Sequence, residues 1–235
     1  MDALDRVAAP ARDLLGRVDA TLVALGAPDQ PQLWELLSRV GALPGGAFEF
    51  VAELRPAPMT VAADHLRDRA DGYRQECAAL AGNVDETIWQ GAGHEAFTSR
   101  WRALAGYLDP EGVGAGPDPD SMAGRMRLLA SYLDAVADWV VDTRHEVART
   151  LAAALSSAEA VRLRAAARAA GAEDVPTDRS AATAAAALAW AILSAVDDTV
   201  ARGRQLHGAW APRLGRVDYR PAADPGGYTP TIVSA

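Results

Sequence analysis

Residues Asn83–Leu108 read NVDETIWQGAGHEAFTSRWRALAGYL, and this stretch decides the fold. It contains the tripeptide Trp89-Gln90-Gly91, and apolar residues recur in steps of four and three on both sides of the tripeptide. They are Met59, Ala63, Leu66, Ala70, Tyr73, Cys77, Leu80 and Val84 before it, and Phe97, Trp101, Leu104 and Leu108 after it. This spacing lines apolar side chains along one stripe of a helix. The sequence therefore predicts two packed helices.

The predicted connection between the two helices is a tight turn. Trp89, Gly91 and Gly93 are its candidate residues, because glycine adopts positive φ angles that other residues avoid. The candidate packing residues of the hairpin are Tyr73, Cys77, Leu80, Val84, Phe97 and Trp101. Cys77 is the only cysteine, so an internal disulfide is impossible, and its place in the stripe favours a buried apolar side chain over a reactive thiol.

The stretch Trp89-Gln90-Gly91-Ala92-Gly93, followed by Ala96, Phe97 and Trp101, resembles the WXG family. This family comprises the small helical-hairpin proteins of type VII (ESX) secretion in Gram-positive bacteria and actinobacteria. The resemblance covers about residues 58–108 and implies that Trp89 and Gly91 define the bend, while Phe97 packs along the following helix. This chain is more than twice as long as one hairpin.

The resemblance implies a non-enzymatic protein that packs lengthwise on a helical partner. That partner is a WXG-type hairpin protein or a second copy of the chain, and contact with type VII secretion machinery is a further expectation. The expected location is outside the cell or in the cell envelope. The alternative is a cytoplasmic scaffold, adaptor or escort that self-assembles. The family's export signal, a tyrosine followed four residues later by an acid, occurs only as Tyr107–Glu111, and Pro110 inside it disfavours a continuing helix.

Charge and composition exclude several classes of protein. A net charge of −8 argues against nucleic acid as a partner. All 23 basic residues are arginine, which excludes P-loop, pyridoxal and protein-kinase sites because each needs a lysine. The wealth of alanine and arginine suggests a high-GC genome, and the resemblance to the WXG family implies an actinobacterial source.

No catalytic or metal-binding pattern is recognisable in the sequence. The four histidines, His65, His94, His145 and His207, share no metal-ligand spacing with one another or with Cys77. No nucleophile elbow and no dinucleotide fingerprint occurs. We therefore expect no enzyme activity, no metal and no cofactor.

The fold class predicted is all-α, an elongated antiparallel helical bundle built around the hairpin. The predicted segments are an N-terminal helical extension (1–56), the hairpin (57–108), a long-helix pair (118–211) and a flexible tail rich in proline and glycine (212–235).

Several local features of the helices follow from the sequence. In the first helix, Pro10 suggests a start at that residue. Asp118 is the expected cap of a helix that continues towards Ala170, and Trp139 on its flank is a candidate partner contact. The apolar run Ala181–Val196 is short and mostly alanine, so a membrane span is not expected.

Overall fold

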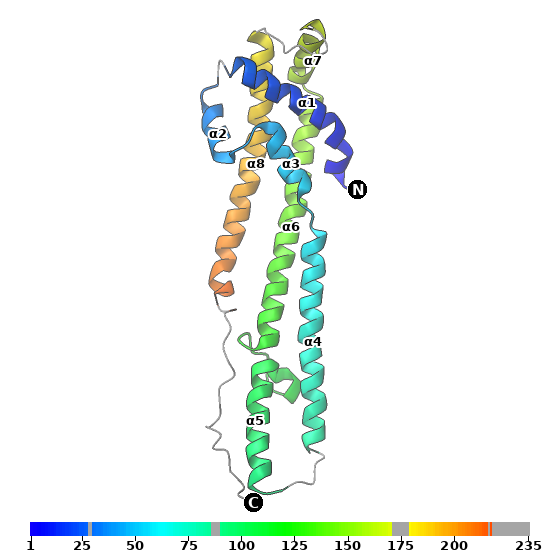
Figure 1. Cartoon of the computed structure of the whole chain (residues 1–235), viewed down its shortest axis with the longest axis vertical. Helices are drawn as coiled ribbons and strands as arrows, with labels where there is room; N and C mark the ends of the chain where they lie inside the picture. The colour runs from blue at the N-terminus through cyan, green and yellow to red at the C-terminus, as the bar shows by residue number, and fades with distance from the viewer. Residues whose placement is uncertain (28–29, 86–89, 171–178, 216, 218–235) are drawn as a thin grey trace, which may run out of the picture. The chain divides into compact units, whose positions relative to one another are not determined.

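The computed structural model describes residues 1–27, 30–85, 90–170, 179–215 and 217. Within these residues all regular structure is helical, which confirms the predicted all-α helical bundle (Figure 1). The helices in chain order are α1 (Ala3–Leu25), α2 (Gln32–Val40), α3 (Pro44–Glu53), α4 (Ala57–Asp85), α5 (Ala92–Leu108), the 3-10 helix η1 (Pro110–Val113), α6 (Met122–Leu155), α7 (Ala158–Ala170) and α8 (Arg179–Leu214).

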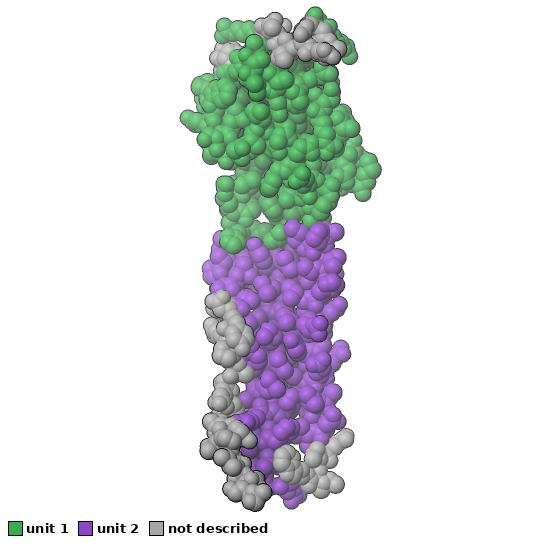
Figure 2. Space-filling view, in the orientation of Figure 1, with its two compact units in different colours: residues 1–56, 136–207 green, residues 57–135, 208–235 purple. Residues whose placement is uncertain are grey.

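The chain forms two units, each assembled from segments distant in sequence (Figure 2). Unit 1 contains residues 1–56 and 136–207, and unit 2 contains residues 57–135 and 208–235. The long helices α6 and α8 contribute residues to both units. The consecutive segments predicted from the sequence therefore differ from these units, since the sequence gives no sign of which remote helices share a core.

Helix α1 begins with a capping box. The Asp2 carboxylate accepts a hydrogen bond from the Asp5 backbone N–H at 2.9 Å, and the Asp5 carboxylate accepts one from the Asp2 N–H at 3.3 Å. Two of the backbone N–H donors at this helix start are thus satisfied. The prediction that the helix starts at Pro10 is wrong: Pro10 lies inside α1 on its exposed face, where water can solvate the carbonyl that loses its intrahelical donor.

Helix α3 receives its N-terminal cap from another helix. Leu43 at the cap position has no side chain able to accept, and the Asp19 carboxylate of α1 accepts from the Gly45 N–H at 3.1 Å instead. A Cβ atom at position 45 would lie 2.5 Å from the Asp19 carboxylate, so glycine permits this contact. Burial raises the pKa of Asp19 to about 6, and the hydrogen bond from Gly45 opposes that rise.

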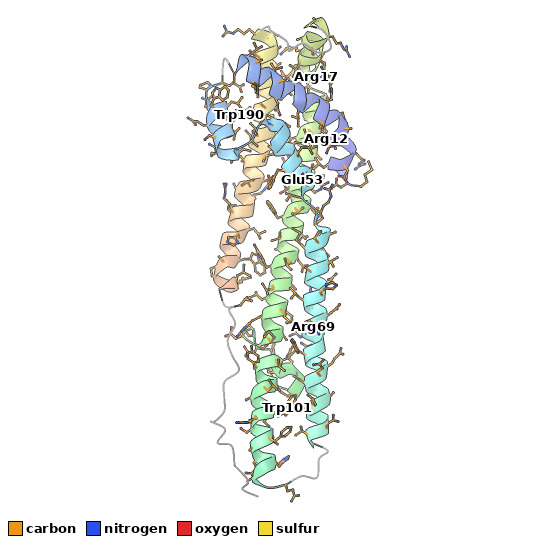
Figure 3. The ribbon with its side chains drawn as sticks, viewed as in Figure 1. Arg12, Arg17, Glu53, Arg69, Trp101 and Trp190 are labelled. Carbon is orange, nitrogen blue, oxygen red and sulfur yellow. The ribbon has the colours of Figure 1, made fainter. Side chains whose placement is uncertain are left out.

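The core of unit 1 joins α1, α2 and α3 to the α6, α7 and α8 residues of that unit. Its large side chains come mainly from α1 and α8, with fewer from α2, α3, α6 and α7, and alanines fill much of the rest. The largest fully buried residues are Leu4, Leu14, Leu15, Leu33, Leu36, Phe48, Leu151, Leu163, Ile192 and Leu193. Arg12, which Figure 3 labels, lies on α1 at the edge of this core. Its guanidinium is 5.6 Å from the Phe48 ring centroid and 2.6 Å from the Glu49 carboxylate.

Arg144 of α6 is a buried cation that joins three segments of unit 1. Its guanidinium pairs with the carboxylates of Asp2 at 2.5 Å and Asp5 at 2.8 Å. It also donates to the carbonyls of Val51, Ala52 and Leu54 at 3.0 to 3.2 Å, which satisfies the open end of α3. The hydrogen bond from Arg144 lowers the pKa of Asp2 to about 2.

The expected continuous helix towards Ala170 is broken. Helix α6 ends at Leu155, and α7 begins at Ala158. The Ser157 hydroxyl accepts from the Ala160 N–H at 3.1 Å and so caps α7, while Ser156 donates to the carbonyls of Ala152 and Ala153. The hydroxyl groups of these two adjacent serines compete with the backbone hydrogen bonds of a continuing helix. The alanine-rich composition of the segment did not predict that the helix ends here.

Unit 2 contains α4, α5, η1 and the first part of α6, and its described interior is built from small residues. The buried apolar side chains are Ala63, Ala70, Cys77, Ala105, Ala123 and Ala130. Helix α6 begins at Met122 after the Ser121 hydroxyl, which accepts from the Gly124 N–H at 3.0 Å. Asp118, the predicted cap, instead accepts a hydrogen bond from the Asp120 N–H and forms a turn that precedes the start of α6.

Replacing Arg144 tests its role in unit 1. We expect Arg144→Met to lower the free energy of unfolding by about 2–4 kcal/mol, because two carboxylates and three carbonyls lose their donor. Denaturant unfolding followed by circular dichroism measures this change. Arg149→Met is the matched control, since Arg149 on the same helix is mostly exposed and should change stability by less than about 0.5 kcal/mol. Equal effects of the two variants would contradict the assignment.

The raised pKa of Asp19 predicts a pH dependence of stability. The folded state holds this proton more tightly than the unfolded state, so the contribution is complete below pH 3.8 and is lost as the pH rises through about 6. The free energy of unfolding of the unmodified protein should fall by about 1–2 kcal/mol between pH 3.8 and about 6, a figure reduced for partial solvent screening. Asp19→Asn should not show this fall, because the asparagine side chain does not titrate. Melting curves of both proteins across this range give the difference. A constant difference would rule out Asp19 as the titrating group.

Candidate functional site

The α4–α5 hairpin region is the candidate site, and its first helix packs through every seventh residue. Ala63, Ala70 and Cys77 of α4 are almost fully buried, and each lies one heptad after the one before it. Burial raises the pKa of the Cys77 thiol, which keeps it protonated at neutral pH and therefore a poor nucleophile. Tyr73 and Val84 of the predicted stripe are half-buried.

The bend between the helices is described only in part. Trp89, the predicted first residue of the turn, lies outside the described residues. Gly91 precedes α5 with φ +97° and ψ −176°, a conformation that only glycine adopts without strain. Gly93 was predicted as a turn residue, and the structure places it inside α5 without a positive φ angle, because the helix begins at Ala92.

Helix α5 is turned differently from the predicted packing. Ala105 is its buried residue, and His94, Thr98, Trp101 and Leu108 form a half-buried row with it in steps of four and three. The predicted packing residue Phe97 is 47% exposed and Leu104 is 43% exposed. On α4 the predicted packing residue Leu80 is 48% exposed. The apolar stripe exists, but its small residues face inward and its large ones are left at the edge.

Helix η1 follows α5 and rests directly on α4. Gly112 makes this possible, because a Cβ atom there would lie 2.7 Å from the Arg74 carbonyl oxygen and 2.8 Å from the Cys77 Cβ. Asp109 begins η1 by accepting from the Glu111 N–H at 3.1 Å. The backbone contact therefore fixes where α5 ends relative to α4.

An ionic cluster surrounds this contact, and the sequence analysis did not identify it. Asp109 is 1% exposed, and its carboxylate pairs with Arg127 of α6 at 3.1 Å and with Arg74 of α4 at 3.5 Å. Glu111 also pairs with both arginines, and Arg127 reaches Asp71 at 3.3 Å. Glu111, the acid of the only Tyr-x-x-x-acid spacing, is thus occupied within unit 2. The residues come from three segments, so no local pattern could have revealed the cluster.

Trp139, predicted as an exposed partner contact, is used inside unit 1. Its indole Nε1 donates to the Thr199 carbonyl of α8 at 3.0 Å. Its ring lies so close to Gly203 that a Cβ atom at that position would be 2.8 Å from the ring. Trp139 therefore packs between α6 and α8 within unit 1, with its ring half-buried, and its role as a partner contact stays a prediction.

Two further features of the described residues concern a metal site and a membrane span. Within ranges 1–27, 30–85, 90–170 and 179–215, no group of three or more His, Cys, Asp or Glu side chains is placed to hold a metal ion. One described helix, α8, has the length and hydropathy of a membrane span, yet 61% of its apolar segment is buried inside the protein. Burial of that kind is also typical of a core helix.

Comparison of the chain with protein-family models, with curated proteins and with solved structures finds no match. The surface chemistry of the hairpin therefore carries the functional interpretation. On that surface, Leu80 lies five residues before the end of α4 and Phe97 five residues after the start of α5. Leu104 follows Phe97 on the same stripe, because seven residues make about two helical turns.

Gly112 provides a stability test of the contact between η1 and α4. We expect Gly112→Ala to lower the free energy of unfolding by about 1–3 kcal/mol, because the added methyl group overlaps the Arg74 backbone and Cys77. Gly106→Ala is the control: position 106 lies inside α5 with open space around its Cβ position, and alanine there should stabilise by about 0.5–1 kcal/mol. In urea titrations, the two variants should change the free energy of unfolding in opposite directions. Stabilisation by both variants would show that the contact is not close.

Proposed function

We propose that this protein is a non-enzymatic interaction protein whose α4–α5 hairpin packs lengthwise on a helical partner. The observation that carries the proposal is the exposed position of Leu80, Phe97 and Leu104. Apolar side chains of this size, grouped on one hairpin, expose surface that association would remove from water. Association with another apolar stripe is the simplest way to cover them.

A helical partner suits this surface better than a small molecule. The exposed residues Phe97 and Leu104 repeat along α5 at a spacing of seven, which matches the contact period of two helices side by side. A small ligand needs a concave site that surrounds most of its surface. Phe97 and Leu104 lie along the length of α5, so a partner helix with apolar residues at the same spacing would bury them most completely.

The more specific form of the proposal is a role in type VII secretion. It rests on the resemblance of Trp89-Gln90-Gly91 and the following Phe97 to the WXG pattern. The glycine conformation at Gly91 and the two helices on either side of residues 86–91 support it. In this form the partner is a WXG-type hairpin protein or a second copy, and the protein is a secreted or cell-envelope component.

The localisation experiment tests the secretion role. The tagged full chain is followed in its native host with and without the type VII motor ATPase. We expect protein outside the cell in the first strain and its loss from that fraction in the second, because the motor supplies export. Protein that stays in the cytoplasm of both strains would overturn the secretion role and favour the alternative, a self-assembling scaffold or escort.

A pair of charge substitutions tests the interaction surface itself. We expect Phe97→Glu with Leu104→Glu to reduce association at least tenfold, since two charges would have to be desolvated at the contact. Cross-linking in the host, together with light scattering of the purified chain over a concentration range, covers a foreign partner and self-association.

Val161→Glu is the matched control for this surface. Val161 is also an exposed apolar residue, at 61% against 47% for Phe97, but it lies on α7 in unit 1. The control should associate like the unmodified protein. Helical content measured by circular dichroism should be the same in all three proteins, which separates loss of binding from loss of folding. Undiminished association of the double variant would place the interaction elsewhere.

A further inference from the structure

A cavity of about 270 Å³ lies in unit 1, between α2, α3 and α8. Its walls are apolar and are formed by Val40, Ala42, Ala47, Phe50, Val196 and Val200. Phe50 at its edge is 55% exposed, although its neighbour Phe48 is fully buried in the core. A concave apolar space beside an exposed aromatic ring has the features of a site for a small ligand.

Three charged residues, Arg39, Asp197 and Arg204, lie around this cavity. Arg39 pairs with Asp197 at 3.0 Å, so the only carboxylate of the lining is neutralised within the protein. Arg204 lies one turn beyond Val200 on α8, and among the described residues it has no ion-pair partner. The cavity therefore combines an apolar interior with a guanidinium, that of Arg204, for which the described part of the chain supplies no ion-pair partner.

We propose that this cavity binds a small amphipathic carboxylate, such as a medium-chain fatty acid. The hydrocarbon chain would lie against Phe50 and Val200, and the carboxylate would pair with Arg204. Arginine presents parallel N–H donors that match the two oxygens of a carboxylate, which makes it well suited to this role. The cavity is slightly smaller than the pockets of about 300–1,000 Å³ that hold drug-sized ligands, so the chain must be short.

This site is independent of the proposed hairpin interaction. Its lining residues all belong to unit 1, whereas the exposed hairpin residues belong to unit 2. Binding at the cavity can therefore be measured on protein whose hairpin carries the Phe97→Glu and Leu104→Glu substitutions. Failure of one proposal leaves the other unaffected.

Calorimetric titration of the full chain with octanoate tests the proposal. We expect saturable binding at one site, and binding of octanol at least tenfold weaker, because the alcohol has no charge to pair with Arg204. Arg204→Gln should weaken octanoate binding about tenfold while leaving octanol binding unchanged. Absence of saturable octanoate binding to the unmodified protein would overturn the proposal.

Two further variants place the bound ligand. Arg202→Gln is the matched control, because Arg202 is an exposed arginine two residues away, on the opposite side of α8, and it does not line the cavity. Its octanoate affinity should equal that of the unmodified protein. Ala42→Leu puts a larger side chain into the cavity from a half-buried position and should abolish binding. Equal loss in both arginine variants, or full binding by Ala42→Leu, would assign the ligand to another surface.

Discussion

The structure depends on close approach of helices through residues with little or no side chain. In unit 2, Gly112 brings η1 against the α4 backbone at Cys77, and in unit 1, Gly203 admits the Trp139 ring. Alanines at positions 63 and 70 continue the same kind of contact along α4. Small residues bury little apolar area each, so such contacts contribute dispersion and exact fit more than hydrophobic transfer energy. An added methyl group at these points has no space, which makes the two glycines structural requirements of their own units.

Arginine supplies the directional interactions that these featureless contacts lack. A stripe of alanines can slide by one turn with little loss, whereas a guanidinium accepts only a few arrangements of its partners. Arg144 gathers two carboxylates of α1 and three carbonyls at the end of α3. Arg127 gathers Asp71, Asp109 and Glu111 from α4 and from the η1 segment. In both units arginine thus fixes the register of segments that are remote in sequence, and the absence of lysine from the chain agrees with this use of planar, multidentate cations.

Sequence periodicity predicted the helices well and their rotations poorly. The steps of four and three located the stripes of α4 and α5 because apolar periodicity is a local property of a helix. They did not show which edge of the α5 stripe packs, since hydrophobicity favours Phe97 whereas close approach favours Ala105. The ionic cluster at Asp109 and the cavity beside Arg204 join residues from remote segments, so they have no local signature. The contact of Trp139 with Gly203 also joins two remote helices, so the sequence around Trp139 does not reveal it.

The same constraint accounts for the surface on which the proposed function rests. Helices that approach through alanine and cysteine leave no room between them for a phenylalanine or a leucine. Three of the large members of the stripes, Leu80, Phe97 and Leu104, lie at the edges and remain partly exposed, whereas Tyr73, Trp101 and Leu108 are half-buried. Small residues at the buried positions of α4 and α5 thus go together with large apolar residues on their exposed surface. A partner helix with large side chains at the same period would complete the packing that the alanines leave unfinished, because it would supply the bulk that the hairpin's own interior excludes.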